Sequence, residues 1–106
     1  MSTKEFTKEI SPNGEDRLRI KLTIEKGEVS DIVVQYESKI KDKWYPIVRY
    51  DCHHGFFHRD VLNAKGENVK QAIPIDNLKD ALTYAEQDIK DRWEWYKEKF
   101  RKGMRR

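Results

Sequence analysis

The amino-acid sequence predicts an α+β fold: an antiparallel sheet of four to five strands, a meander of hairpins, packed against one long C-terminal helix. Three observations predict it. Apolar and polar residues alternate over 17–25 and 29–38, strand-like runs with turn signals between them continue to residue 62, and apolar residues recur every three or four positions after residue 77. The stripe of that helix must cover an apolar surface, and the inner face of the sheet is its natural partner. The 106 residues fit a single domain, 1–106.

The first strands follow from alternation. Residues 1–16 form an N-terminal segment whose structure stays open, because the spacing of Phe6 and Ile10 fits a helix or a strand before the turn signal at 11–14. The segments 17–25 and 29–38, joined by a turn at 25–28, read as two half-buried strands. Their expected inward residues are Leu18, Ile20, Leu22, Ile24, Ile32, Val34 and Tyr36.

The next two strands flank His54 and Gly55. Residues 44–50 and 56–62 are rich in aromatic and β-branched residues, and His54-Gly55 can supply the positive φ of a tight turn. If the loop consists of these two residues, each residue of the first strand pairs with the residue of the second strand for which the two numbers add to 109. Pro46 then requires an edge position, a strand start or a bulge. A fifth, short strand is predicted within 68–75, where Pro74 interferes with its ladder.

One long helix is predicted from Asn77 to about Lys102, with Asp76 or Asn77 as its N-cap. Residues 103–106 form a basic tail. Trp95 and Tyr84 lie off the apolar stripe and are expected to be exposed or to meet a second subunit in a homodimer. The stripe consists of Leu78, Leu82, Ala85, Ile89, Trp93, Tyr96 and Phe100.

Composition narrows the functional classes. The net charge of +3 is too small to indicate nucleic-acid binding by itself. No apolar run approaches the roughly 20 residues that cross a bilayer. The single cysteine, Cys52, excludes an internal disulfide, and with the polar start of the chain it predicts a cytoplasmic protein without membrane insertion. The basic residues after position 97 favour either a solvated helix end or a phosphate-binding tail.

Chemistry-bearing residues concentrate in the segment 49–60, which holds all three histidines and the cysteine. In the register that adds to 109, Arg49 opposes Asp60 and Asp51 opposes His58, which gives two opposite-charge pairs on one face. A loop longer by one residue would reverse the face of one strand. The other, more apolar face holds Val48, Tyr50, Cys52, Phe57, Arg59 and Val61.

This segment resembles a motif that defines a prokaryotic family of small uncharacterised proteins. The motif reads Arg-Tyr-Asp at 49–51, His-Gly at 54–55 and His-Arg-Asp at 58–60, with Trp44 just before it and an aromatic-rich helix after it. The likeness covers about 16–100. The segment is also loosely similar to the TumE-type proteins of toxin-antitoxin pairs, in which an Arg-Tyr-Asp strand precedes a histidine-bearing segment. That resemblance implies an RNA-cleaving toxin with a small antitoxin as partner.

The catalytic interpretation of the segment is a metal-independent ribonuclease with no cofactor. His58, oriented by Asp51, would transfer a proton, and Arg49 or Arg59 would stabilise negative charge on the phosphoryl group. His54 would supply the second proton-transfer group. Basic and aromatic side chains would hold RNA through phosphates and stacking. The candidate catalytic residues are His58, Asp51, Arg49, His54, Arg59 and Asp60.

Two other interpretations compete with catalysis. A divalent-metal site would use His53, His54 and His58, helped by nearby carboxylates or Cys52, but the spacing matches no standard motif and adjacent histidines on a strand point opposite ways. No metal is therefore predicted. A purely structural hairpin, with ion pairs worth about 0.2 to 1 kcal/mol each, would make the protein a non-enzymatic binding or interaction module.

Overall fold

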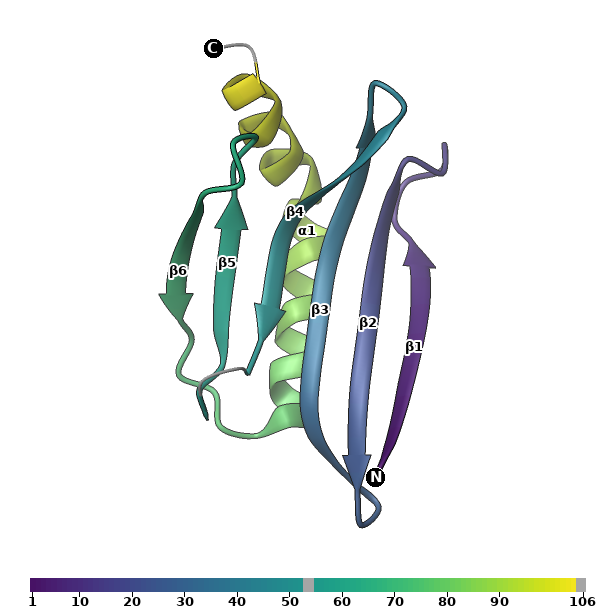
Figure 1. Ribbon diagram of the computed structural model, residues 1–106, viewed down its shortest axis with the longest axis vertical. Coiled ribbons are helices and arrows are strands. Elements are labelled where there is room, and N and C mark those ends of the chain that lie inside the picture. The colour runs from purple at the N-terminus through teal and green to yellow at the C-terminus, as the bar shows by residue number, and fades with distance from the viewer. Residues whose placement is uncertain (53–54, 105–106) are drawn as a thin grey trace.

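The computed structural model describes residues 1–52 and 55–104. Its strands form one antiparallel sheet in which each strand pairs with the next along the chain, so that the spatial order is β1-β2-β3-β4-β5-β6 (Figure 1). The predicted α+β meander with one C-terminal helix is confirmed, with six strands in place of four or five. The elements are β1 (Ser2–Glu9), β2 (Asp16–Glu25), β3 (Glu28–Ile40), β4 (Lys43–Asp51), β5 (His58–Leu62), β6 (Asn68–Ala72) and α1 (Leu78–Met104).

The additional strand is β1, in the segment whose structure the sequence left open. It runs along β2 in a continuous register from Ser2 opposite Ile24 to Glu9 opposite Arg17. All eight of its residues are exposed, because β1 lies at the edge of the sheet and beyond most of the helix (Figure 1). Its composition therefore lacks the apolar alternation of a half-buried strand.

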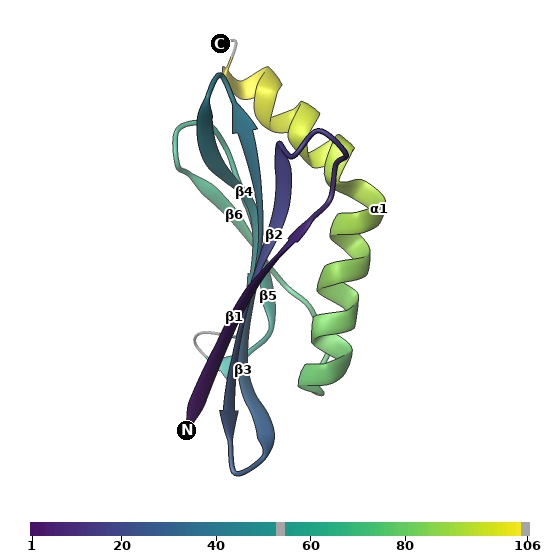
Figure 2. The same cartoon turned by 90° about the vertical axis from the view of Figure 1, so that its right-hand side faces the viewer.

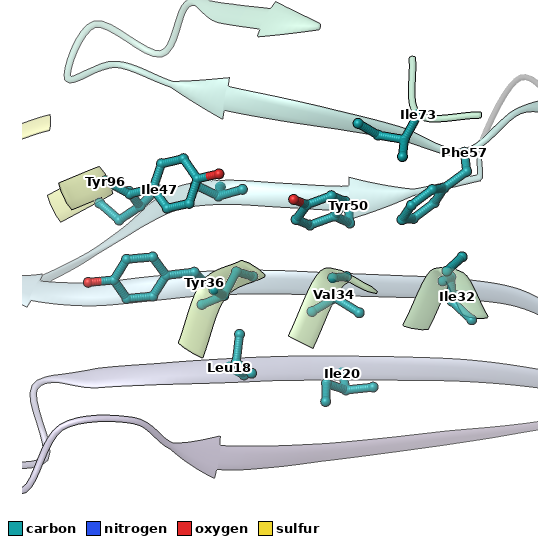
Figure 3. Packing of buried hydrophobic residues seen from close by; sticks show 14 of the residues in the cluster. Leu18, Ile20, Ile32, Val34, Tyr36, Ile47, Tyr50, Phe57, Ile73 and Tyr96 are labelled. Carbon is teal, nitrogen blue, oxygen red and sulfur yellow. The ribbon is translucent and has the colours of Figure 1, made fainter. Parts of the chain in front are cut away.

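The molecule has two layers, with α1 lying along one face of the sheet (Figure 2). Tyr36, Tyr50 and Tyr96 are the largest fully buried side chains between the layers (Figure 3). The inward residues predicted for β2 and β3 are buried here, except that Leu22 and Ile24 are only half-buried. The helix contributes Ala81, Ala85, Ile89, Tyr96 and Phe100 to the core. In the described residues no element covers the opposite face, which we call the open face (Figure 2).

Pro46 lies at a bulge, one of the three positions that the sequence allowed. Glu37 pairs with Pro46 and Tyr36 pairs with Val48, so Ile47 is an extra residue in β4. Both Ile47 and Val48 are buried as a result. The missing N–H of proline therefore coincides with a point where the ladder is already interrupted.

The helix begins as the sequence predicts. Asn77 Oδ1 accepts hydrogen bonds from the backbone N–H groups of Lys79 at 2.9 Å and Asp80 at 3.1 Å, so Asn77 is the N-cap. Ala81, which the predicted apolar stripe did not include, is fully buried. Leu82 and Trp93, which the stripe did include, are only half-buried. Across the described residues, no helix combines the length and the apolar character needed to cross a bilayer.

Candidate functional site

The β4–β5 hairpin has the predicted register. Asp51 pairs with His58, Tyr50 with Arg59, and Arg49 with Asp60. The predicted two-residue loop is wrong, however, because the ladder stops at Asp51 and His58 and Phe57 lies outside the strands. Phe57 turns into the core, where its ring stacks on Tyr50 with centroids 5.4 Å apart, and this leaves a longer connection. His53 and His54 lie outside the described residues.

Three side chains of this hairpin meet on the open face: Asp51, His58 and Asp60, which we call the open-face cluster. His58 Nε2 lies 2.9 Å from Asp51 Oδ1 and 3.5 Å from Asp60 Oδ2. All three residues are buried, and His58 is only 1% exposed. Strand alternation and the register together bring them to one face, as the sequence predicted for Asp51 and His58.

The second expected pair differs in detail. Arg49 and Asp60 are cross-strand neighbours, but the Arg49 Nε donates instead to Asp51 Oδ2 at 3.0 Å, along its own strand. Asp60 turns toward His58. Within the described residues, Asp60 Oδ1 is buried and has no hydrogen-bond partner. The Asp51 carboxylate thus contacts both an arginine and a histidine, whereas Asp60 has one oxygen without a hydrogen-bond partner among the described residues.

The imidazole of His58 faces an acceptor on each side. Its Nδ1 lies 3.2 Å from the backbone oxygen of Phe56, and its Nε2 faces the Asp51 carboxylate. A neutral imidazole carries one N–H and can donate to only one of these groups, while the protonated ring donates to both. The Phe56 ring packs beside the imidazole at a centroid distance of 5.2 Å and is itself 45% exposed. Phe56 therefore separates the buried histidine from solvent.

The cluster forms part of the wall of a hollow of about 500 Å³ on the open face. Neighbouring strands add Lys21 from β2, Asp31 from β3 and Lys70 from β6. Sequence reasoning missed these three residues. The signal that finds them is the register across the whole sheet, in which Lys21 opposes Val33, Val33 opposes Asp51, and Lys70 opposes Asp60.

A second hollow of about 350 Å³ adjoins the first over β1 to β4. The two share Lys21, Val33 and Arg49, and the second one adds Arg19. Cationic side chains therefore extend from the cluster across the open face. An extended anionic ligand lying on this face would meet several of them in turn.

Arg59 does not join the cluster, although the sequence offered it as a phosphate ligand. Strand alternation places Arg59 on the face of the sheet that the helix covers. There its Nη1 donates to the hydroxyl oxygens of Tyr50 at 3.2 Å and Tyr96 at 3.1 Å. The same nitrogen lies 3.4 Å from Asp88 Oδ2. Both tyrosines donate to the same Asp88 oxygen. Burial, and then the hydrogen bond to Asp88, raise the pKa of Tyr96 to about 12. Arg59 therefore joins the sheet to α1.

The residues able to hold a metal differ from those expected. In the described part of the chain, Asp51, His58 and Asp60 each bring one donor atom within 4.8 Å of the others. Of the predicted ligands His53, His54 and His58, only His58 belongs to this group. Burial raises the pKa of the Cys52 thiol, which disfavours the thiolate that metals bind.

The fold and the cluster together define a class of small α+β protein: an antiparallel meander with a helix on one face and a buried histidine between carboxylates on the other. The chain belongs to a family described as a domain of unknown function (DUF7718), whose model matches residues 1–106. Comparison with curated proteins and with solved structures gives no significant match.

Proposed function

We propose that this protein is an RNA-cleaving toxin of a toxin-antitoxin pair and that the open-face cluster is its reacting centre. One observation carries the proposal. An imidazole, three carboxylates and three cationic side chains, Lys21, Arg49 and Lys70, line a single hollow on the uncovered face of the sheet. Cleavage of RNA without a metal needs these groups: a base, an acid and a cation near the phosphate.

The cluster divides the proton transfers between two residues. Asp60, whose Oδ1 has no hydrogen-bond partner in the described residues, accepts the proton of the RNA 2′-hydroxyl. The 2′-oxygen then attacks the phosphorus, and the bond to the 5′-oxygen breaks. His58, which lies between Asp51 and the Phe56 carbonyl, acts in its protonated form as the acid and donates a proton to that leaving oxygen. The products are a 2′,3′-cyclic phosphate and a free 5′-hydroxyl.

The surroundings of the cluster suit an RNA strand. The side chain of Arg49 is 48% exposed and lies beside Asp51, so its guanidinium can reach a phosphate in the hollow. Arg19 supplies a further cation along the adjoining hollow. The exposed ring of Phe56 offers a surface on which a base can stack, and its displacement would open a path to His58.

The biological role as a toxin rests on the TumE-like order of an Arg-Tyr-Asp strand and a following His-Arg-Asp segment. A small protein encoded beside this one would act as antitoxin. Covering the open face would be the most direct way to block the hollow. The chain's own side chains leave that face accessible at Arg49 and Phe56.

Growth after induction tests the role. The wild-type chain should arrest growth of a bacterial host, and co-expression of the adjacent gene should relieve the arrest. His58→Gln, expressed to the same level, should not arrest growth. Normal growth with the wild-type chain, or arrest that persists undiminished with His58→Gln, would contradict the proposal.

An interaction module without catalysis is the second candidate, and the edges of the sheet favour it. All residues of β1 and of β6 are exposed, including Val69 at 71%. Unpaired backbone groups on an exposed edge strand can accept a strand from another chain. Stable binding of a partner protein together with intact total RNA after induction would favour this function over cleavage.

A further inference from the structure

We infer that Asp51, His58 and Asp60 form a binding site for one divalent transition-metal ion of the Zn²⁺ type. The inference goes beyond the proposed function, because ion binding requires neither RNA nor catalysis. It also replaces the ligand set expected from the sequence, since it uses one histidine and two carboxylates.

The spacing of the donor atoms fits a common ion. Zinc binds nitrogen and oxygen ligands at about 2.0 to 2.2 Å, so two ligands of one ion lie about 2.8 to 3.1 Å apart in octahedral geometry and about 3.3 to 3.6 Å apart in tetrahedral geometry. His58 Nε2 lies 2.9 Å from Asp51 Oδ1 and 3.5 Å from Asp60 Oδ2. Both separations fall within these ranges, and the donor atoms of all three residues lie within 4.8 Å of one another, so side-chain movements that bring the two carboxylates closer would complete the site.

The groups around the ligands orient them for an ion. Metal-binding histidines usually donate their second ring N–H to a carbonyl or carboxylate, and His58 Nδ1 lies 3.2 Å from the Phe56 carbonyl oxygen. In the tautomer that donates from Nδ1 to this oxygen, the lone pair is on Nε2 and is available to an ion. Arg49 donates to Asp51 Oδ2 and leaves Oδ1 directed toward the cluster. Each of these two ligands therefore has a partner that holds it in place.

The third ligand supplies an independent observation. Asp60 is 7% exposed, and its Oδ1 is buried without a hydrogen-bond partner in the described residues. A buried carboxylate oxygen without a partner is costly, and a bound cation removes the cost. Two carboxylates also balance the charge of a divalent ion. Three protein ligands leave further coordination positions toward the hollow, as in metal sites that bind a small ligand.

Binding of the ion and the acid-base mechanism exclude each other. The ion takes the lone pair of His58 Nε2, which in the ion-free chain carries the proton for the leaving oxygen. It also occupies Asp60, the base. The ion-loaded chain therefore lacks both proton-transfer groups of the proposed mechanism, and Zn²⁺ should suppress a cleavage activity that persists in a chelator.

Calorimetric titration of the full-length chain with ZnCl₂, after dialysis against a chelator, tests the inference without RNA. We expect one ion per chain. In a parallel NMR titration, the chemical shift of His58 Nε2 should change as the ion binds. Asp60→Asn should weaken binding by about tenfold or more. Circular dichroism is to be used to check that this variant folds. Asp42→Asn, in an exposed turn, is the matched control that should bind as the wild type does.

The double variant with His53→Gln and His54→Gln separates the two ligand sets. It should keep the stoichiometry and bind within about twofold of the wild type. Absence of saturable binding to the wild-type chain, loss of binding in the double variant, or unchanged binding in Asp60→Asn would each overturn the inference. Cleavage of RNA in chelator is a separate readout, so the site and the proposed function can fail independently.

Discussion

Asp51 and His58 face each other across the β4–β5 hairpin, with Asp51 Oδ1 2.9 Å from His58 Nε2 on the face of the sheet that no described element covers. Arg49 holds the other oxygen of the carboxylate. The pair is buried, yet it borders a hollow lined with cations.

The two arginines of the motif should have opposite phenotypes. Arg49→Gln should lower RNA cleavage by about a hundredfold, because its guanidinium is expected to stabilise charge on the phosphate. It should lower the free energy of unfolding less than Arg59→Gln does, because the Arg49 side chain is 48% exposed and water can replace it beside Asp51. Arg59→Gln should lower the free energy of unfolding by about 1 to 3 kcal/mol, because Tyr50, Tyr96 and Asp88 lose a buried partner. Below its melting temperature it should still cleave RNA. Urea unfolding and a cleavage assay measure both effects, and equal losses of cleavage in the two variants would contradict this division.

The salt dependence of RNA binding should identify the cations that contact phosphate. Lys21→Gln and Lys70→Gln should each weaken binding of a single-stranded RNA and reduce the slope of log affinity against log salt concentration by about 0.7. Lys79→Gln, an exposed lysine in the first turn of the helix, is the control and should leave the slope unchanged. Fluorescence anisotropy at several salt concentrations gives the slopes. A reduction for Lys79 as large as for Lys21 would show that binding is not confined to the open face.

The helix should contribute stability through its buried stripe. Ile89 is completely buried between α1 and the sheet, so Ile89→Ala should cost about 2 to 5 kcal/mol through lost burial and a residual cavity. Glu94→Ala, exposed on the same helix, should change the free energy of unfolding by less than about 0.5 kcal/mol. Urea denaturation compares the two. Similar small losses would mean that the stripe is not buried.

Asp16 should make stability depend on acid pH. Burial alone would raise its pKa, but hydrogen bonds from Tyr36 and Ser38, each 2.7 Å long, and the charge of Lys97 bring the pKa below its ordinary 3.8. A lowered folded-state pKa stabilises the fold above the unfolded pKa, and the contribution is lost as pH falls through the folded value. Asp16→Asn should therefore cost about 1 to 3 kcal/mol at pH 7. The difference from wild type should shrink below pH 3.8 in denaturation experiments, and a constant difference would contradict this origin.

Local pattern was sufficient for most of the fold. The alternation over 17–25 and 29–38 identified β2 and β3, and the spacing of Ala85, Ile89 and Tyr96 identified the buried side of α1. The sequence did not predict β1, because an edge strand whose two faces are both exposed has no alternation of apolar and polar residues. The two-residue loop was wrong because the described ladder ends at Asp51 and His58, which leaves Phe57 outside the strands, and the turn signal at His54-Gly55 did not indicate where pairing stops.

Only the part of the site that lies within the β4–β5 hairpin could be predicted from the sequence. The register brought Asp51 opposite His58 from sequence numbers alone, and alternation already assigned Arg59 to the other face. Side-chain direction was not predictable, so the turn of Asp60 toward His58 and the bond of Arg49 to Asp51 emerge only in three dimensions. Lys21 and Lys70 come from strands far along the chain, and the order of the whole sheet is needed to place them at the hollow.

The most direct test of the central claim is cleavage of a defined RNA by the purified chain in the presence of a chelator. The wild-type chain should release fragments that end in a 2′,3′-cyclic phosphate. His58→Gln and Asp60→Asn should each lower the rate by about a hundredfold or more, while Asp42→Asn cleaves as the wild type does. Mass spectrometry identifies the fragment ends. Intact RNA with the wild-type chain, or wild-type rates with His58→Gln, would show that the open-face cluster is not the reacting centre of a ribonuclease.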